Sequence, residues 1–179
     1  MASVLHEHRR PIRVEPSKLY YQIGIRSHDR GVFTKEAVSG AELGGKKVFS
    51  VEPGDLVANI VFGWEGAVAV ILEDLLGHCG SHRFPTYRRA DEGPIDYMRH
   101  LLLSRRGIEI LGLASPGGAG RNRTLNRCWL GGFTIPWPSL NEQRAASAAL
   151  LAIEARLRAF TAELAALRRF RADLLFALL

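Results

Sequence analysis

Cysteine and long apolar runs are both scarce in this sequence. Its 179 residues include two cysteines, Cys79 and Cys128, which are too few and too far apart for a disulfide framework or a zinc cluster. No apolar stretch reaches the roughly 18 residues that cross a bilayer, and the first residues carry charges where a signal peptide needs an apolar run. We therefore expect free thiols, no membrane segment and a cytoplasmic protein.

Motifs of several enzyme classes are also missing. The sequence contains no Pro-Pro pair, which the base-holding tetrapeptide of an amino DNA methyltransferase requires, and no Glu-x-Lys of a metal-dependent nuclease. Nucleophile-elbow, zinc-protease and Walker phosphate-loop patterns are absent as well. The segment HCGSH places His78, Cys79 and His82 close together, but a tetrahedral site needs a fourth ligand. We expect no catalytic residue, no metal and no cofactor bound by this chain.

The charge of the chain shows a modest basic excess. Lysine and arginine total 24 against 18 acidic residues, which gives a formal net charge of +6. This charge is compatible with an anionic partner but does not by itself indicate one. No polybasic tail is present, so any binding to nucleic acid must come from local clusters of basic side chains.

Residues 1–138 have the pattern of a β-rich domain. β-branched and aromatic runs of strand length predict short strands; these runs are YYQIGIR, KKVFSV, DLVANIVF and GAVAVIL. Between two of them, Pro53 and Gly54 suit a type II turn over Glu52–Asp55. Pro94–Leu113 predicts one helix, or two short ones, packed on the sheet, with an interruption at Gly107. The fold class expected is α+β.

Residues 139–179 have a different character. Pro136 and Pro138 favour an extended connection, and Ser139 with Glu142 has the spacing of a helix capping box. Large apolar residues then recur at alternating steps of three and four, which is typical of a coiled-coil seam: Leu150, Ile153, Leu157, Phe160, Leu164, Leu167, Leu174 and Leu178. Arg171 occupies the missing seam position. We predict a single long helix for dimerisation; the alternatives are a helix folded back on its own sheet and a helix lying on a membrane surface.

Basic and amide side chains gather in segments that we expect to be loops. Such groups can reach phosphates and base edges of DNA. The candidate DNA-binding residues, in order of preference, are Arg121, Asn122 and Arg123 in a Gly-rich loop, then Arg26, His28 and Arg30, then Lys46, Lys47 and Arg83. Each segment alone is also compatible with an ordinary solvated loop. We interpret Trp64 and Phe84 as core residues, with stacking on bases as the alternative.

Together these segments resemble the specificity subunits of type I restriction-modification systems. The likeness extends from about Tyr20 through the helix and rests on YQIGIRSHDRGVFTKEAVSGAELGGKKVF, VEPGDLVANIVFGWEGAVAV, SHRFPTY, LASPGGAGRNRTLN and IPWPSLNEQR. The resemblance implies a target-recognition domain at 1–138 and a spacer helix at 139–179, in a subunit that is itself non-catalytic. It also implies double-stranded DNA as ligand, a methyltransferase subunit using S-adenosylmethionine, and a motor-nuclease subunit using ATP and magnesium.

In that family, two recognition domains each read half of a split target, and two long helices pack antiparallel between them. This chain departs from that pattern in having one domain and one helix, so it resembles a half subunit, natural or truncated, that pairs as a homodimer. Two other functions remain open: a coiled-coil module that binds a protein, and the detached recognition domain of a single-chain DNA methyltransferase.

Overall fold

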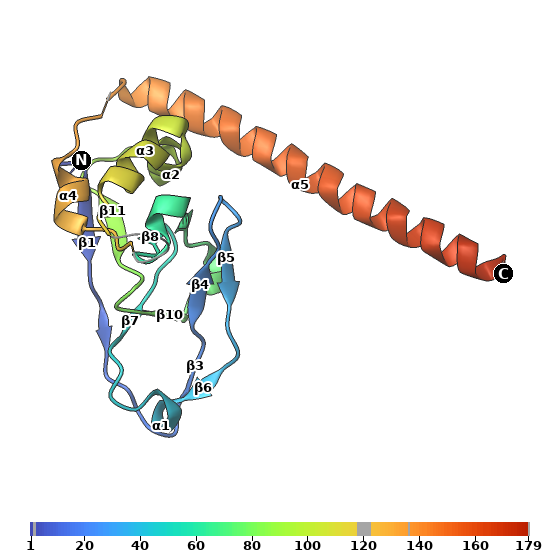
Figure 1. Ribbon diagram of the computed structural model, residues 1–179, viewed down its shortest axis with the longest axis horizontal. Coiled ribbons are helices and arrows are strands. Elements are labelled where there is room, and N and C mark those ends of the chain that lie inside the picture. Colours follow the sequence, from blue (N-terminus) through green and yellow to red (C-terminus); the bar gives the residue numbers. More distant parts are fainter. Residues whose placement is uncertain (2, 118–122, 136, 179) are drawn as a thin grey trace. The chain divides into compact units, whose positions relative to one another are not determined.

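A computed structural model describes residues 1, 3–117, 123–135 and 137–178. The chain divides into two compact units, Met1–Pro138 and Ser139–Leu179. The N-terminal unit combines short antiparallel strands with helices, and the second unit is one long helix, so the predicted α+β class is confirmed (Figure 1). None of the helices in the described residues is both long and apolar enough to cross a membrane.

The strands of the N-terminal unit form four small sheets. One sheet has the order β1-β11-β8-β9, another has β10-β7-β2, and two pairs are β3-β6 and β4-β5, all antiparallel. The strands are β1 (Leu5–His8), β2 (Pro11–Ile12), β3 (Leu19–Tyr20), β4 (Ile23–Ile25), β5 (Val32–Thr34), β6 (Val38–Ser39), β7 (Val48–Ser50), β8 (Leu56–Ala58), β9 (Val68–Val70), β10 (Cys79–Ser81) and β11 (Thr86–Arg89). The helical elements are α1 (Gly40–Leu43), η1 (Gly63–Glu65), η2 (Glu73–Leu75), α2 (Ile95–Leu103), α3 (Arg105–Leu113) and α4 (Arg127–Gly132).

The four apolar runs all contain strands, and the turn before β8 has the expected chemistry. Gly54 has a φ of 81°, and the Asp55 N–H donates to the Glu52 carbonyl at 3.0 Å. The third run differs from the prediction at its end, because β8 stops at Ala58 and the chain then turns into η1.

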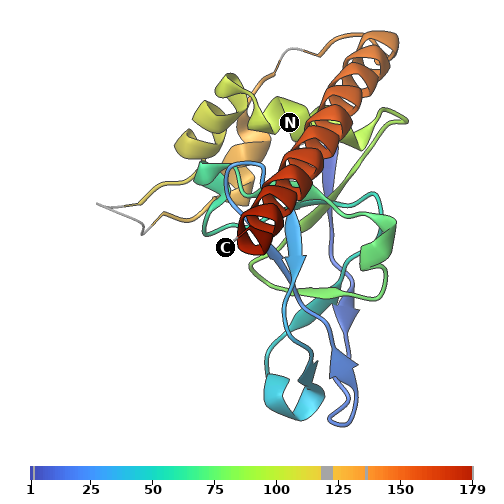
Figure 2. The same cartoon turned by 90° about the vertical axis from the view of Figure 1, so that its right-hand side faces the viewer.

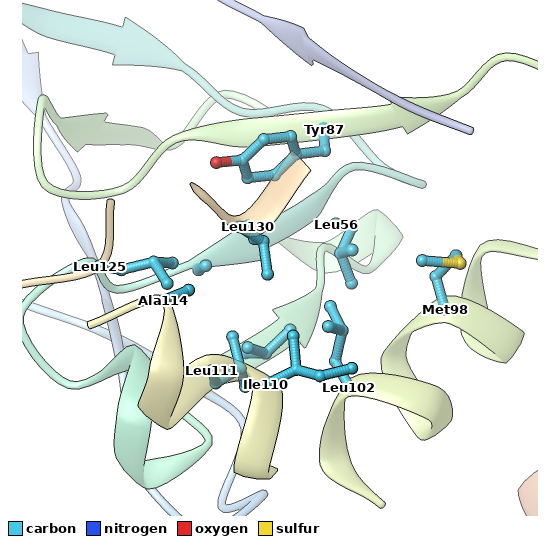
Figure 3. Close-up of a cluster of buried hydrophobic side chains, with 11 residues drawn as sticks. Leu56, Tyr87, Met98, Leu102, Ile110, Leu111, Ala114, Leu125 and Leu130 are labelled. Carbon is cyan, nitrogen blue, oxygen red and sulfur yellow. The ribbon is translucent and has the colours of Figure 1, made fainter. Parts of the chain in front are cut away.

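The strand β8 separates two hydrophobic clusters because its side chains alternate between faces. Leu56 packs with helical residues such as Met98 and Leu111, as Figure 3 shows. Val57 instead belongs to a second cluster, which contains Ile23 of β4. The β4–β5 hairpin is therefore fixed to one side of the four-stranded sheet, whereas α2 and α3 cover the other.

The helical segment after β11 is two short helices, and the break lies at Ser104 rather than at the predicted Gly107. Ser104 ends α2 and caps α3, since its hydroxyl accepts a hydrogen bond from the Gly107 N–H at 3.1 Å. Gly107 lies in the first turn of α3, where an added Cβ would come within 2.1 Å of the Leu101 carbonyl oxygen. The glycine permits the sharp reversal between the helices without being the break.

The second unit is the helix α5, Leu140–Ala177, of 38 residues. Both halves of the predicted capping box are present at its start, between Ser139 and Glu142. The hydrogen bonds from Ser139 hold the pKa of Glu142 below its ordinary value. At 1.5 Å per residue the helix is about 57 Å long. The predicted seam residues are between 40% and 81% exposed.

Candidate nucleic-acid interface

Three of the predicted DNA-binding residues lie together in the loop of the β4–β5 hairpin. Arg26, His28 and Arg30 are all exposed there. The loop closes through a hydrogen bond from the Arg26 N–H to the Gly31 carbonyl at 3.0 Å. At its tip His28 and Asp29 have φ values of 59° and 54°, a left-handed conformation that residues other than glycine seldom adopt.

Contacts from outside the hairpin tie this tip in place. Arg99 of α2 is almost buried and donates to Asp29 Oδ1 at 2.9 Å. Glu65 of η1 binds the loop twice: its backbone carbonyl accepts from the His28 N–H at 2.9 Å, and its carboxylate accepts from Ser27 Oγ at 2.7 Å. The loop therefore has one defined conformation, and both nearby carboxylates already have hydrogen-bond partners.

Two of the predicted arginines stack on aromatic rings. The Arg26 guanidinium carbon lies 4.6 Å from the centre of the Phe33 ring, and that of Arg123 lies 5.3 Å from the Trp64 ring. Such cation–π contacts restrict the side chain while leaving guanidinium N–H groups available as donors. The interaction therefore orients both arginines before any ligand binds.

A groove of about 420 Å³ joins the hairpin tip to the neighbouring helical elements. Its lining comes from the hairpin, η1 and the facing ends of α2 and α3: His28, Asp29, Trp64, Glu65, Leu103 and Ile108. Since Arg123 stacks on Trp64, the hairpin tip and Arg123 belong to one part of the N-terminal unit. This part combines basic side chains with an aromatic surface, a composition suited to nucleic acid.

The remaining predicted residues are not all in this part of the domain. Lys46 and Lys47 are exposed between α1 and β7, and α1 lies at the opposite end of the N-terminal unit from the β4–β5 loop in both Figure 1 and Figure 2. Arg83 is exposed in the connection between β10 and β11. Arg121 and Asn122, the first candidates, lie outside the described residues. Of the predicted DNA-binding residues, the structure thus brings Arg26, His28, Arg30 and Arg123 together in one part of the N-terminal unit.

Phe84 and Trp64, the two aromatic residues interpreted as core, have different surroundings. Phe84 is buried in the second hydrophobic cluster, which confirms that interpretation. Trp64 is half-buried, lines the groove and carries Arg123, so its assignment to the core was wrong. The segment HCGSH forms no cluster, and no group of three potential metal ligands occurs within the described part of the chain.

Arg99 and Glu65, the residues that hold the hairpin tip, are not among the residues predicted from the sequence. One signal was available. His28-Asp29 stands between two apolar runs, in the stretch RSHDRG, which has its one glycine at Gly31 rather than at the tip. A tip with positive φ and no glycine needs support from elsewhere in the fold, although the sequence does not say from which residues.

Comparison with known proteins identifies the fold. The N-terminal unit and helix together match the crystal structure of the HsdS subunit from Thermoanaerobacter tengcongensis, with a TM-score of 0.64 and 20% identity over 94% of this chain. A second structure, described by its role in complex assembly and conformational transition of the type I restriction-modification system, matches with a TM-score of 0.63 and 20% identity over 95% of this chain. The chain spans 45% of each of these longer chains.

At this identity the likeness establishes the fold, and the predicted resemblance to type I specificity subunits is confirmed at that level. No protein-family model matches the sequence. No curated protein matches it either.

Proposed function

We propose that this chain recognises one half of a split DNA target as the specificity component of a type I restriction-modification system. The observation that carries the proposal is the rigid basic loop of Arg26, His28 and Arg30 on an HsdS-like fold, with Arg123 stacked on Trp64 nearby. Side chains on a fixed backbone, with Arg26 and Arg123 further restricted by stacking, can meet phosphates and base edges at a reduced cost in conformational entropy. The net charge of +6 favours the same ligand.

The helix α5 supplies the second half of the proposed mechanism. Its seam is apolar and exposed over most of its length, and it is too regular for scattered surface leucines. We infer that a second copy of the chain covers it, so that two recognition units are held apart by a pair of helices. Two identical readers related by a two-fold axis would read an inverted repeat with a fixed gap.

An antiparallel arrangement suits the seam best. With Leu150 opposite the partner's Leu174, every seam position from Leu150 to Leu174 faces another seam position, and Arg171 faces the partner's Ile153. A parallel pair aligned in register would instead place two Arg171 side chains against each other in the apolar seam, which is unfavourable. In the antiparallel register Glu154 also lies near the partner's Arg168, which adds an attraction of opposite charges on each side of the axis.

Catalysis in this proposal belongs to other subunits. A methyltransferase subunit with S-adenosylmethionine would modify the selected site, and a motor-nuclease subunit with ATP and magnesium would act on unmodified DNA. The present chain contributes the selection of sequence and the spacing of the two half-sites, in the cytoplasm.

The proposal is tested with the purified full chain and a library of DNA duplexes that contain a randomised segment. Bound duplexes are recovered at low salt, because a small module neutralises few phosphates, and they are then sequenced. We expect enrichment of an inverted repeat with a constant gap. If repeated rounds enrich no sequence although the protein remains folded, the chain is not a DNA-specificity subunit.

A seam variant provides the matched control. Leu157→Glu combined with Leu164→Glu places charges in the apolar seam and leaves every candidate DNA contact unchanged. This variant should enrich a single half-site without the symmetric partner and without a fixed gap. Retention of the full inverted repeat by a monomeric variant would contradict the role proposed for α5.

A further inference from the structure

The tip of the β4–β5 hairpin has an unfavourable sequence for its conformation. His28 and Asp29 are consecutive residues with positive φ, at 59° and 54°. Glycine occupies the left-handed region without the Cβ clash that other residues meet there, and asparagine, aspartate and histidine are the other residues found there most often. Glycine at either position would relieve the backbone, so the turn alone does not explain both His28 and Asp29.

The contacts of Asp29 account for one of the two residues. The Asp29 carboxylate accepts a hydrogen bond from Arg99, which is only 8% exposed. The two residues are 70 positions apart in the sequence, so this ion pair connects the hairpin tip to α2. Asp29 thus compensates for its backbone conformation with an ion pair that fixes the tip relative to the helix.

The contacts of His28 differ from those of Asp29. Its backbone N–H is bound by the Glu65 carbonyl, but its side chain is exposed and borders the groove beside Trp64. A neutral imidazole presents one hydrogen-bond donor and one acceptor, and base edges in the major groove offer both kinds of partner. A two-stranded β-ribbon such as the β4–β5 hairpin fits the major groove of DNA, which is about 12 Å wide.

We propose that His28 is the base-reading residue of this loop and that Asp29 and Arg99 are its positioning pair. The inference deepens the proposed function and rests on it. Arg26 and Arg30 flank the tip and are placed to meet the phosphates on either side of the base pair that His28 contacts. Because Asp29 is paired with the Arg99 guanidinium, its carboxylate repels DNA less than a free one would.

Two substitutions of His28 distinguish an effect on base preference from an effect on the stability of the fold. His28→Gly suits a positive φ, so the variant should melt at the same temperature as the wild type or higher. It should nevertheless lose roughly ten-fold preference at one base pair of each half-site, the usual cost of one lost base contact. His28→Asn also tolerates the backbone conformation but offers an amide, and it should change which base is preferred at that position.

Asp29 is tested by a pair of variants that both tolerate positive φ. Asp29→Gly removes the group that Arg99 holds, so the preference at the His28 position should become weaker while other positions are unchanged. Asp29→Asn keeps an oxygen acceptor for Arg99 and should restore most of the preference. A purely structural role would instead change the melting temperature or the affinity for all sequences equally. His6→Asn, at an exposed histidine on β1, serves as the control and should leave the selected sequence unchanged.

The outcomes distinguish the inference from the function on which it rests. Enrichment of one sequence by the wild type, with altered preference at a single position in both His28 variants, supports the inference. Enrichment of the same sequence by wild type, His28→Gly and His28→Asn overturns it and leaves the proposed function standing. Enrichment of no sequence by the folded wild type overturns both.

Discussion

Asp55 is a fully buried carboxylate that begins the strand β8 from its turn. Two arginines bind it: Arg10, in the connection between β1 and β2, through Nη1 at 2.7 Å, and Arg88 of β11 through Nε at 2.7 Å. The Glu52 backbone N–H also donates to it at 2.9 Å, and hydrogen bonding to Asp55 raises the pKa of Arg88. These contacts with the buried charge of Asp55 hold the N-terminal segment against the sheet. Both arginine side chains remain partly exposed to water.

The substitution Asp55→Asn keeps the volume of the side chain and removes its charge. Glu52 remains as a second carboxylate paired with both arginines, at 3.3 Å from Arg10 Nε and 3.1 Å from Arg88 Nη2. Because only the buried one of the two counter-ions is lost, and both arginines are partly exposed, we expect a loss of about 2 kcal/mol in the free energy of unfolding, less than the full value of a buried pair. Urea unfolding of the full chain measures the change. Asp74→Asn, at an exposed carboxylate in η2, is the control and should change stability by less than about 0.5 kcal/mol. Equal unfolding midpoints for both variants would show that the buried network contributes nothing.

The helix α3 contains two glycines, Gly107 and Gly112, and replacing them with alanine should affect the stability of the protein in different ways. Alanine is the better helix former by about 1 kcal/mol, so propensity alone predicts that any helical Gly→Ala change is stabilising. At Gly107, however, a Cβ would meet the Leu101 and Leu102 carbonyl oxygens at 2.1 and 2.4 Å. At Gly112, in the same helix, a Cβ would meet no atom within 4 Å.

The two substitutions should therefore change the free energy of unfolding in opposite directions. Gly107→Ala should lower the free energy of unfolding by about 1–3 kcal/mol, because backbone atoms at the helix junction must move apart. Gly112→Ala should raise it by about 0.5–1 kcal/mol. Thermal unfolding followed by circular dichroism measures both changes. Stabilisation by both variants would mean that the junction is loose enough to accept a side chain at Gly107.

These elements also show what a sequence can predict. The turn at Gly54 and the capping box of Ser139 and Glu142 were predictable because their chemistry lies within four residues. Ser104 caps α3 by the same local logic and was overlooked because a glycine three residues later is a more conspicuous break. The contact of Arg99 with Asp29 joins residues 70 positions apart, and only the folded chain reveals it. For this reason the exposed loop positions of Arg26, His28 and Arg30 were predictable, and the residues that support the loop were not.

The orientation in which two copies of α5 would pair can be tested at a single charged residue. Glu163 lies beside the seam, one position before Leu164. In the antiparallel register proposed above it faces the partner's Glu163 close to the two-fold axis, and like charges repel. In a parallel, in-register pair it would face the partner's Arg168 instead. The two arrangements therefore predict opposite effects for removal of this one charge.

Glu163→Gln should strengthen the antiparallel dimer and weaken a parallel one, in each case by about two- to five-fold in the dissociation constant at low salt, the range of an exposed charge pair. Sedimentation equilibrium at several protein concentrations measures the constant, and high salt should diminish the difference, because screening weakens exposed charges. Thr161→Val, which replaces a neutral side chain of similar size on the same stretch of helix, controls for local helix stability. A weaker dimer for Glu163→Gln with an unchanged Thr161→Val would contradict the antiparallel register and favour a parallel pair of helices.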